Sequence, residues 1–494
     1  MSGGNLAGLL DGPAQWSADR PAILVGDRPV RTWSELAEAV ARRGASLRDR
    51  FGVLPGDAVA IFAANCASYL EVLFSVWHAG AVAVPISNRL HPREAAALVE
   101  SSRAKVCFAD VDLGGPVVDI SSPVDSDPIA RVPRRLDDDA WIFFTSGTTG
   151  RAKGARLTHG NLFAMAVAYY ADAAEVGPSD SIIHVASLSH ASGLMSLPFI
   201  GRGAAQVLPE SGKFDVAELF ELVAAGERST FFVPPTLLRR ICDSPVSGDG
   251  IGTVMVGAAP VLPSDLKRGH ALLGPVLWNG YGQGESPCTI TAHGKAAIAA
   301  AVEANDEERL ASVGVARLAT RVRVVGPDDE PLPPGEVGEV VVDGPTVMAG
   351  YLDMPEASAE TLRGGWLHTG DLGRFDETGH LTLVDRAKDV VISGGYNVYP
   401  REVEDVLLTD PAVADVAVLG VPDEEWGERV IAYVVAPNGV DEGALDQLCL
   451  DTIARHKRPK EYVVIDELPR NAAGKVLKRS LRELYLEQVP DAAR

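Results

Sequence analysis

The sequence predicts an α/β protein with a large N-terminal domain of layered α/β sheets, a small β-rich subdomain and a small α+β C-terminal domain. From about residue 33 to residue 383, short apolar runs alternate with amphipathic helical stretches, a pattern typical of layered and largely parallel sheets. Near residue 320 the pattern changes to strands joined by Gly, Pro and Asp turns. A charged junction at 385–389 then precedes a compact tail. We therefore expect one domain over residues 1–387, with its β-rich part at about 318–385, and a second domain over 388–494.

Short apolar runs bounded by polar or turn residues predict the buried strands. In the first part of the chain they are Ala58–Phe62, Ala81–Val84, Ser181–Val185, Thr230–Val233 and Thr253–Val256. A helix is expected to begin after Pro263, with Ser264 as its N-cap. The strands expected in the β-rich part and the tail are Arg321–Val325, Gly338–Asp343, His380–Val384, Val416–Leu419, Val430–Val435 and Glu461–Ile465.

The composition of the chain disfavours several classes of function. With 494 residues, 46% of them apolar, the chain can bury large cores and is not expected to be disordered. A formal net charge of −22 argues against binding nucleic acid, whose backbone requires basic surfaces, and against adsorption to an anionic membrane. Five scattered cysteines without a CxxC spacing predict neither a disulfide framework nor a zinc site. Because the N-terminus lacks a secretory pattern and no apolar run approaches roughly 18 residues, we expect a cytoplasmic protein, either a monomer or a homodimer.

A Gly- and Thr-rich loop follows the predicted strand Trp141–Phe144. Its residues are Thr145, Ser146, Gly147, Thr148, Thr149, Gly150, Arg151, Ala152, Lys153 and Gly154. Glycines allow the backbone to approach a ligand closely, while the hydroxyls, the backbone N–H groups and Lys153 supply donors and charge that suit a polyphosphate. A solvated linker is the simpler alternative. The loop is not a Walker A motif, because Lys153 precedes a glycine where that motif has Ser or Thr.

This loop resembles the phosphate-binding signature of the adenylate-forming superfamily, which includes acyl-CoA synthetases, aryl-CoA ligases, peptide-synthetase adenylation domains and luciferases. Further signatures follow in the same order between about residues 30 and 480, and the chain looks most like a bacterial fatty-acid or 4-coumarate-type acid–CoA ligase. The resemblance implies Mg²⁺ as cofactor, ATP and CoA as co-substrates, and a mobile C-terminal domain. It also implies that the ATP phosphates are bound by Thr145, Ser146, Gly147, Thr148, Thr149 and Lys153.

A second motif follows the apolar run at 275–278 and consists of Asn279, Gly280, Tyr281, Gly282, Gln283, Gly284 and Glu285. It is not a dinucleotide-binding GxGxxG motif, because Glu285 stands in place of the third glycine. It resembles the aromatic-Gly-x-Thr-Glu motif of the superfamily, which implies nucleotide contacts along the motif, with Tyr281 near the adenine. By the same resemblance Glu285 helps to hold Mg²⁺ on the ATP phosphates; the alternative is a surface carboxylate at a strand end.

Gly284 departs from the superfamily pattern, which usually has threonine at this position. Loss of one positioned donor typically costs about 10²–10³ in rate. If nothing replaces the missing hydroxyl, Gly284→Thr is expected to tighten the use of ATP.

Three residues near the predicted junction match further positions of the superfamily. Asp371 follows Gly370 and is implied to bind the ribose hydroxyls, although an aspartate in such a turn is more often only a turn former. Arg386 is implied to complete the ribose contact. Lys388 matches the hinge about which the C-terminal domain rotates between two half-reactions. Without the resemblance, the junction is an ordinary exposed turn.

Two turns in the C-terminal domain complete the set of signatures. Gly394, Gly395 and Tyr396 resemble the loop that lines the pantetheine tunnel of CoA ligases. Lys457, within a basic run at 455–460, is a candidate for binding a phosphate of CoA, and a solvated charge run is equally compatible. Lys475 matches the mobile lysine that neutralises charge between the carboxylate and the α-phosphate.

The pocket for the acid is implied by the resemblance alone. The residues that would line it are His190, Gly193, Thr236 and Gly280, next to a nucleotide-contacting turn of Gly257, Ala258 and Ala259. His190 matches a position that gates the carboxylate, although a lone histidine is more often structural. Ser187 and Ser189 replace the usual proline and aromatic residue. The small residues Ala258, Ala259 and Gly280 are expected to leave room for a sizeable apolar acid.

Together the motifs predict an AMP-forming acid–CoA ligase, with Lys475, Glu285 and His190 as catalytic candidates. Such an enzyme adenylates a carboxylic acid, fatty or aryl, with MgATP and then forms a thioester with CoA. One alternative passes the activated group to a carrier protein or an amine, or activates another small oxyanion. Another is a non-catalytic nucleotide-binding homologue, which the joint presence of the motif residues disfavours. The sequence leaves the identity of the acid open.

Overall fold

The computed structural model describes residues 4–113, 117–145, 152–423, 426–471 and 475–488. The chain divides into two compact units, one formed by residues 1–322 and 342–368 and the other by residues 323–341 and 369–494. The predicted boundary near Lys388 lies inside the second unit and stays a prediction. The mixed architecture of several sheets and covering helices confirms the predicted α/β class.

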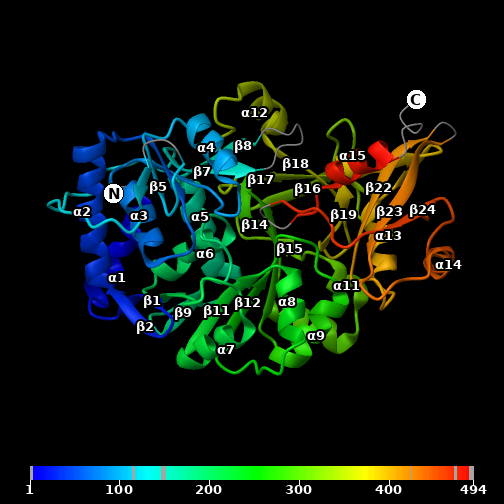
Figure 1. Ribbon diagram of the computed structural model, residues 1–494, viewed down its shortest axis with the longest axis horizontal. Coiled ribbons are helices and arrows are strands. Elements are labelled where there is room, and N and C mark those ends of the chain that lie inside the picture. Colours follow the sequence, from blue (N-terminus) through cyan, green and yellow to red (C-terminus); the bar gives the residue numbers. More distant parts are fainter. Residues whose placement is uncertain (1–3, 114–116, 146–151, 424–425, 472–474, 489–494) are drawn as a thin grey trace. The chain divides into compact units, whose positions relative to one another are not determined.

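The first unit contains a nine-stranded sheet (Figure 1). Its six central strands run parallel, and the strands beyond them pair antiparallel at the edges. In sheet order the strands are β15 (Val315–Ala316), β14 (Ser286–His293), β13 (Leu277–Gln283), β12 (Ile251–Val256), β11 (Arg228–Val233), β9 (Asp180–Ile183), β10 (Ala205–Leu208), β1 (Pro21–Val25) and β2 (Arg28–Thr32).

A six-stranded sheet completes the strands of this unit. All its neighbouring strands are parallel except the last two, which form an antiparallel pair. In sheet order the strands are β6 (Val117–Asp119), β5 (Val106–Ala109), β3 (Ala58–Phe62), β4 (Val82–Pro85), β7 (Asp139–Thr145) and β8 (Lys153–Thr158). The loop predicted to bind phosphate therefore joins the antiparallel pair β7–β8.

Helices cover both sheets of the first unit. They are η1 (Leu6–Leu10), α1 (Asp11–Trp16), α2 (Trp33–Phe51), α3 (Ala67–His78), α4 (Pro92–Ser101), α5 (His159–Asp172), α6 (Ala191–Ile200), α7 (Val216–Ala225), α8 (Pro235–Cys242), α9 (Pro263–Leu273), α10 (Lys295–Ala304), α11 (Glu307–Ala311), α12 (Pro355–Thr361) and η2 (Arg363–Gly365).

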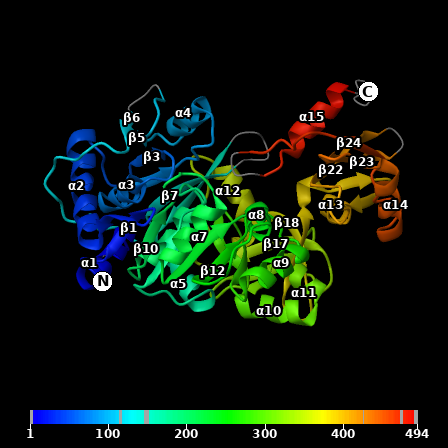
Figure 2. The same ribbon diagram turned by 60° about the horizontal axis from the view of Figure 1, so that its bottom comes forward.

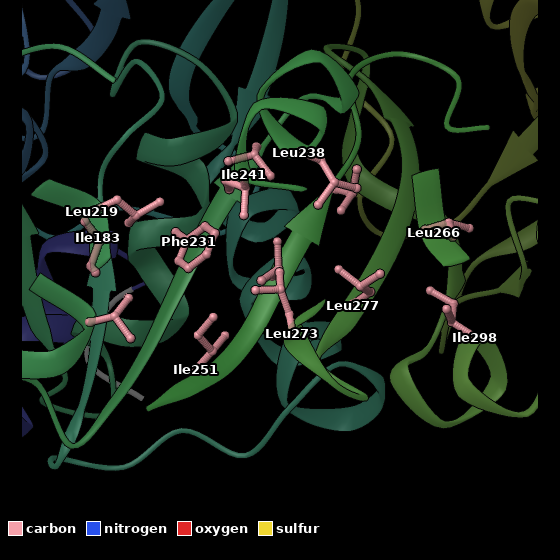
Figure 3. Packing of buried hydrophobic residues seen from close by; sticks show 14 of the residues in the cluster. Ile183, Leu219, Phe231, Leu238, Ile241, Ile251, Leu266, Leu273, Leu277 and Ile298 are labelled. Atoms are coloured by element: carbon pink, nitrogen blue, oxygen red, sulfur yellow. The ribbon is translucent and has the colours of Figure 1, made fainter. Parts of the chain in front are cut away.

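One buried cluster fixes the strands that carry the second motif (Figure 3). Leu219, Leu238 and Leu266 from α7, α8 and α9 join Phe231 of β11 and Leu277 of β13 in this cluster. Each of these side chains is almost completely buried, which contributes roughly 1.5–3 kcal/mol per side chain. The helices therefore hold β11, β12 and β13 in register, and the turns after β12 and β13 lie at the same edge of the sheet.

One local expectation needs correction. Ser264 is not the N-cap of α9, because the helix begins at Pro263 and Leu262 is its N-cap residue. Proline suits the first helical position, since its missing N–H group would have no partner there. The residues from Asn279 to Gln283 continue β13 as a strand, and a tight turn at 284–285 leads into β14.

The second unit contains most of a four-stranded sheet and a separate five-stranded sheet. The four strands are, in order, β16 (Arg321–Val325), β17 (Gly338–Asp343), β18 (Leu367–Phe375) and β19 (Leu381–Arg386). The other sheet has the order β21 (Tyr396–Val398), β20 (Val391–Ser393), β23 (Gly427–Val435) and β22 (Asp415–Asp423), with β24 (Glu461–Val464) paired to β23. The helices are η3 (Ala387–Asp389), α13 (Pro400–Leu407), α14 (Glu442–Thr452) and α15 (Lys478–Gln488).

The helices α13, α14 and α15 lie around the five-stranded sheet (Figure 2), and successive side chains of β22 alternate between two apolar clusters. Val416 and Val418 join the apolar cluster of α13 and α14, whereas Ala417 and Leu419 join that of α15. This is the two-residue period expected of a sheet covered on both sides. Throughout the described ranges, no helix has both the length and the apolar character needed to cross a membrane.

Candidate active site

The Glu285 carboxylate lies in the turn between β13 and β14 and is buried, with 9% exposure. Two hydroxyl groups donate to its Oε1 atom, Thr145 Oγ1 at 3.1 Å and Tyr351 Oη at 2.9 Å. Within the described part of the chain, no donor reaches Oε2. One carboxylate oxygen is therefore anchored by the protein, while the other is available to a ligand.

Tyr351 connects Glu285 to Lys153. Its segment pairs with β8, where Leu352 N–H donates to Gly154 O at 2.8 Å. Lys153 Nζ lies 4.8 Å from the centroid of the Tyr351 ring, within the range of a cation–π interaction. Burial raises the pKa of Tyr351, and the nearby negative charge of Glu285 raises it further, so the hydroxyl stays protonated as a donor. Tyr351 could not be identified from the sequence, because no local pattern distinguishes this tyrosine from one that only fills the core.

The segment that carries Tyr351 is held in place by α5 and by the backbone of Glu285. Asn161 Nδ2 donates to Pro345 O at 2.7 Å and to Val347 O at 2.9 Å. Met348 N–H donates to Glu285 O at 2.8 Å. Both the backbone and the side chain of Glu285 are thus bonded to residues 345–351, which fixes the direction of the carboxylate.

Gly284 packs tightly against β7, and this reverses the expectation that a threonine would be useful there. A Cβ atom on Gly284 would lie 2.6 Å from both Phe143 Cδ1 and Thr145 Cγ2. Both separations are well below van der Waals contact. If Thr145 rotated away to relieve the overlap, its hydrogen bond to Glu285 would be lost. The glycine is therefore required by the side chains of its neighbours.

His190 is the N-cap residue of α6, and its ring packs edge-on against Phe143. The ring centroids are 5.4 Å apart and the planes are inclined at 83°. Because Phe143 also borders Gly284, it joins His190 to the residues around Glu285 in one contiguous cluster. Burial lowers the pKa of His190 to about 4, with a smaller contribution from the positive charge of Arg89, so the ring is neutral at pH 7.

Two glycines that were expected to line the acid pocket have their side-chain positions filled by neighbours. A Cβ atom on Gly280 would overlap the ring of Trp278, and one on Gly193 would overlap the carbonyl oxygen of Leu188. The place of a Gly280 side chain is therefore occupied by Trp278, and a role of Gly280 in the acid pocket stays a prediction. Thr236, the remaining predicted pocket residue besides His190, is exposed on α8.

The turn after β12 lies next to β13, as expected if both elements contact one ligand at the carboxyl-terminal edge of the sheet. A Cβ atom on Gly257 would come within 2.9 Å of Gly280 O. Ala258 has a φ of +66°, a left-handed conformation that is strained for a residue with a Cβ atom. Ala258 and Ala259 are exposed. An exposed, strained turn beside the second motif is typical of a ligand-binding loop.

Asp371 and Arg386 meet across the antiparallel pair β18–β19, where they are register partners. Arg386 Nε lies 3.1 Å from Asp371 Oδ1. Asp371 is buried and Arg386 is half-buried. Lys388 follows in the short helix η3 and is exposed.

The Gly394–Gly395 turn has φ values of +58° and +81°, which favour glycine at both positions. A Cβ atom on Gly394 would lie 2.7 Å from Trp426 Cε3, so the Trp426 ring covers this side of the turn. Tyr396 is exposed and stacks on His456, with ring centroids 4.7 Å apart. One side of the turn is thus covered by the Trp426 ring, whereas the place of a Gly395 side chain is open.

The two predicted lysines of the C-terminal part differ in environment. Lys457 Nζ lies 2.7 Å from each carboxylate oxygen of Glu402, so this ion pair already neutralises the lysine expected to bind CoA phosphate. Lys475 is exposed; its N–H donates to Asn471 Oδ1 at 2.9 Å and its carbonyl accepts from Asn471 N–H at 2.8 Å. The side chain of Lys457 is thus held by an ion pair, whereas Asn471 holds the backbone of Lys475.

Ser146, Gly147, Thr148 and Thr149 lie outside the described residues. Among the residues that are described, no three or more His, Cys, Asp or Glu side chains gather in a way that could hold a metal ion. The residues nevertheless fit Mg²⁺, which is commonly bound by one or two carboxylates together with substrate phosphates. Glu285 Oε2 is a carboxylate oxygen of this kind.

Comparison with known proteins gives matches over both parts of the chain. Residues 11–352 match the family model described as AMP-binding enzyme, and residues 402–475 match the AMP-binding enzyme C-terminal domain. Feruloyl-CoA synthase from Amycolatopsis sp. is 37% identical over 475 residues, covering 92% of this chain and 94% of that protein.

Solved structures of similar sequence share the whole fold. O-succinylbenzoate coenzyme A synthetase (MenE) from Bacillus subtilis, in complex with ATP and a magnesium ion, has a TM-score of 0.87 at 28% identity and covers 96% of this chain and 98% of that one. The amide bond synthetase McbA from Marinactinospora thermotolerans has a TM-score of 0.86 at 27% identity and covers 98% and 99%.

Proposed function

Because the chain belongs to the AMP-binding enzyme family, we propose that it is an AMP-forming acid–CoA ligase that joins a fatty or aryl carboxylic acid to CoA with MgATP. One observation carries the proposal. Three segments that lie far apart in the sequence meet around one buried carboxylate: Thr145 and Tyr351 donate to Glu285, and Lys153 lies over the Tyr351 ring. That cluster combines hydroxyl donors, a cation and a free carboxylate oxygen, which is the set of groups that a metal-bound polyphosphate requires.

In the first half-reaction, a carboxylate oxygen of the acid attacks the α-phosphorus of ATP. A bond between that oxygen and the phosphorus forms, the bond to the bridging oxygen breaks, and pyrophosphate leaves. Lys153 and the loop at 145–149 hold the phosphates by charge-assisted hydrogen bonds. Lys475 neutralises the negative charge that develops between the carboxylate and the α-phosphate.

Glu285 is the residue that would hold Mg²⁺, through its Oε2 atom, while Thr145 and Tyr351 orient the carboxylate through Oε1. When bound, the ion supplies charge neutralisation to the phosphates. A single protein carboxylate is sufficient, since the phosphate oxygens and water supply the remaining ligands.

Asp371 accepts hydrogen bonds from the ribose hydroxyls, and Arg386 holds that carboxylate in position. In the second half-reaction, the sulfur of CoA attacks the acyl carbon of the adenylate. The carbon–sulfur bond forms, the bond to the AMP oxygen breaks, AMP leaves, and the thiol proton passes to solvent. Rotation about Lys388 exchanges Lys475 for the loop of Gly394, Gly395 and Tyr396 between the two steps.

A second candidate function is the transfer of the activated acyl group to an amine. The similarity to an amide bond synthetase over nearly the whole chain favours it, because the adenylation step is the same and only the acceptor differs. The ion pair between Lys457 and Glu402 removes one argument for CoA from the basic run.

A pyrophosphate-release screen with the full-length protein tests the proposal. Acids of different length and aromaticity, such as octanoic, palmitic, ferulic and 2-succinylbenzoic acid, are incubated with MgATP, and active acids are then supplied with CoA or with amines. Thioester formation is the expected result; amide without thioester would favour the second candidate. Glu285→Gln is the matched control, since it keeps the shape of the side chain and removes its charge. Absence of pyrophosphate release with every acid would contradict the adenylation chemistry.

A further inference from the structure

Ser187, Ser189 and His190 form a hydrogen-bonded chain beside Phe143. Ser187 Oγ lies 2.8 Å from Ser189 Oγ, and Ser189 Oγ lies 2.8 Å from His190 Nδ1. Ser189 is 2% exposed, so its hydroxyl has little access to water. The proline that Ser187 replaces has no side-chain donor or acceptor and could not form such a chain.

The direction of the hydrogen bonds follows from counting hydrogens. Ser187 Oγ already accepts a hydrogen bond from Ser189 N–H at 3.3 Å. If Ser187 donates to Ser189 and Ser189 donates to His190 Nδ1, every hydroxyl hydrogen has an acceptor. In the opposite direction, the hydrogen of Ser187 would find no acceptor within the described part of the chain. The direction in which every hydroxyl hydrogen has an acceptor in the protein is the one that leaves the hydrogen of the neutral imidazole on Nε2; in the other direction only water could accept from the half-buried Ser187.

The loop that carries the chain is rigidly supported. Asn65 Nδ2 donates to His184 O at 3.0 Å and to Ala186 O at 2.8 Å, and Asn65 Oδ1 accepts from Leu188 N–H at 2.8 Å. Gly193 of α6 lets the Leu188 carbonyl approach without a Cβ in the way. The serines are thus held before any ligand arrives, as preorganised groups must be.

We propose that Ser187 and Ser189 are positioning residues that fix His190 as a neutral Nε2–H donor to an oxygen of the acid's carboxylate or of the acyl-adenylate formed from it. The inference rests on the proposed function and deepens it. His190 Nε2 has no hydrogen-bond partner among the residues that the structure describes. The ring borders Phe143, which in turn borders the turn of Glu285. With the other tautomer, a nitrogen lone pair would face the substrate oxygen, and the two would repel each other.

The charge state of His190 supports this role. Its low pKa keeps the ring neutral throughout the physiological range, and Arg89 is the charged side chain that acts on it. The imidazole therefore acts as a fixed dipole and need not exchange a proton with the substrate.

A double-mutant cycle measured as kcat/KM for an activated acid tests the proposal. His190→Phe should lower kcat/KM by about 10²-fold, as expected for loss of one positioned donor. Ser189→Ala should lower it about tenfold, the effect of one lost hydrogen bond. If Ser189 acts only through His190, then adding Ser189→Ala to His190→Phe should cause no further loss. An additive loss, or full activity of Ser189→Ala, would overturn the proposal.

Ser192→Ala is the matched control. Ser192 Oγ lies 2.8 Å from Nδ1 of the buried His184, whose other nitrogen lies 3.0 Å from Gln206 Oε1. Ser192→Ala also breaks a buried hydrogen bond between a serine and a histidine in the same region. Both ring nitrogens of His184 already have protein partners, so this histidine cannot bind the substrate. Its kcat/KM for the acid should stay at the wild-type value; a tenfold loss would show that the effect of Ser189→Ala is structural.

Nitrogen-detected NMR of ¹⁵N-histidine-labelled full-length protein tests the tautomer without any acid. The His190 signals are assigned by their disappearance in His190→Phe. The Nε2–H form is expected in the wild type and a mixture of tautomers in Ser189→Ala. A wild-type Nδ1–H form would overturn the proposal even if the enzyme proves to be a ligase. An Nε2–H form in a protein that activates no acid would instead locate the failure in the proposed function.

Discussion

Tyr351→Phe should weaken the dependence of adenylation on Mg²⁺ without removing the contact between the ring and Lys153. The substitution deletes one of the two hydroxyls that anchor Glu285 Oε1, and only Thr145 at 3.1 Å remains. A hydrogen bond to a charged group is worth about 1.5–3 kcal/mol. Loss of a group that orients a metal ligand typically costs about 10- to 100-fold in metal affinity or activity.

The assay is the initial rate of pyrophosphate release at saturating ATP and acid, measured against the concentration of Mg²⁺. The concentration for half-maximal rate should rise by about 10- to 100-fold in Tyr351→Phe. Because the phenyl ring remains under Lys153, the KM for ATP at saturating Mg²⁺ should change little. Tyr351→Leu removes the ring as well, and in that variant the KM for ATP should also rise.

Tyr170→Phe provides the control for the loss of a tyrosine hydroxyl. Tyr170 donates to Pro198 O, away from the cluster around Glu285. Its Mg²⁺ dependence should match the wild type. If Tyr351→Phe also matched the wild type, then the hydrogen bond to Glu285 would have no role in metal binding.

Three further outcomes follow from the same geometry. Gly284→Ala should lower the rate of adenylation, because the added methyl overlaps Phe143 and Thr145 at a cost of about 1–3 kcal/mol. Adding Phe143→Leu to Gly284→Ala should restore part of that rate. A Gly284→Ala rate above the wild-type rate would refute the packing argument. Lys475→Ala should lower acid-dependent pyrophosphate release by about 10²–10³ while sparing thioester formation from supplied acyl-adenylate; equal loss in both assays would rule out a role confined to the first step. Lowering the pH from 7 to 5 should destabilise the fold, since burial lowers the pKa of His159 and of His184 from 6.5 to about 4. Because the pKa of each histidine is lower in the folded than in the unfolded protein, the unfolded state takes up the proton first as the pH falls. The stability that each neutral histidine contributes is therefore complete above pH 6.5 and decreases toward pH 4. At pH 5 the loss is about 2 kcal/mol per histidine. Denaturant unfolding at both pH values measures it, and His184→Gln should remove about 2 kcal/mol of the loss; a pH-independent free energy of unfolding would contradict the assignment.

The α/β class, most strands and the chemical motifs could be predicted from the sequence because they depend on neighbours along the chain. Ala58–Phe62 is an apolar run and became β3 without change. Asp371 and Arg386 were identified from short motifs, and the structure pairs them across β18–β19. The roles of these residues stay predictions.

Other features could not be predicted, because they depend on residues remote in the sequence. Tyr351 reaches Glu285 across 66 residues, and only the pairing of its segment with β8 brings the two together. The motif at Gly284 suggested a missing hydroxyl, whereas the rings and methyl groups of β7 occupy the place where it would be.

By itself, then, the sequence determined the class of fold, the family signatures and which side chains carry reactive groups. The tertiary structure alone decided which of those groups meet, which glycines make room for a neighbour, and that the serines before His190 form a chain. The reason is physical: local patterns encode backbone preference and chemistry, whereas contacts between distant segments are set by sheet register and by the filling of space in the core.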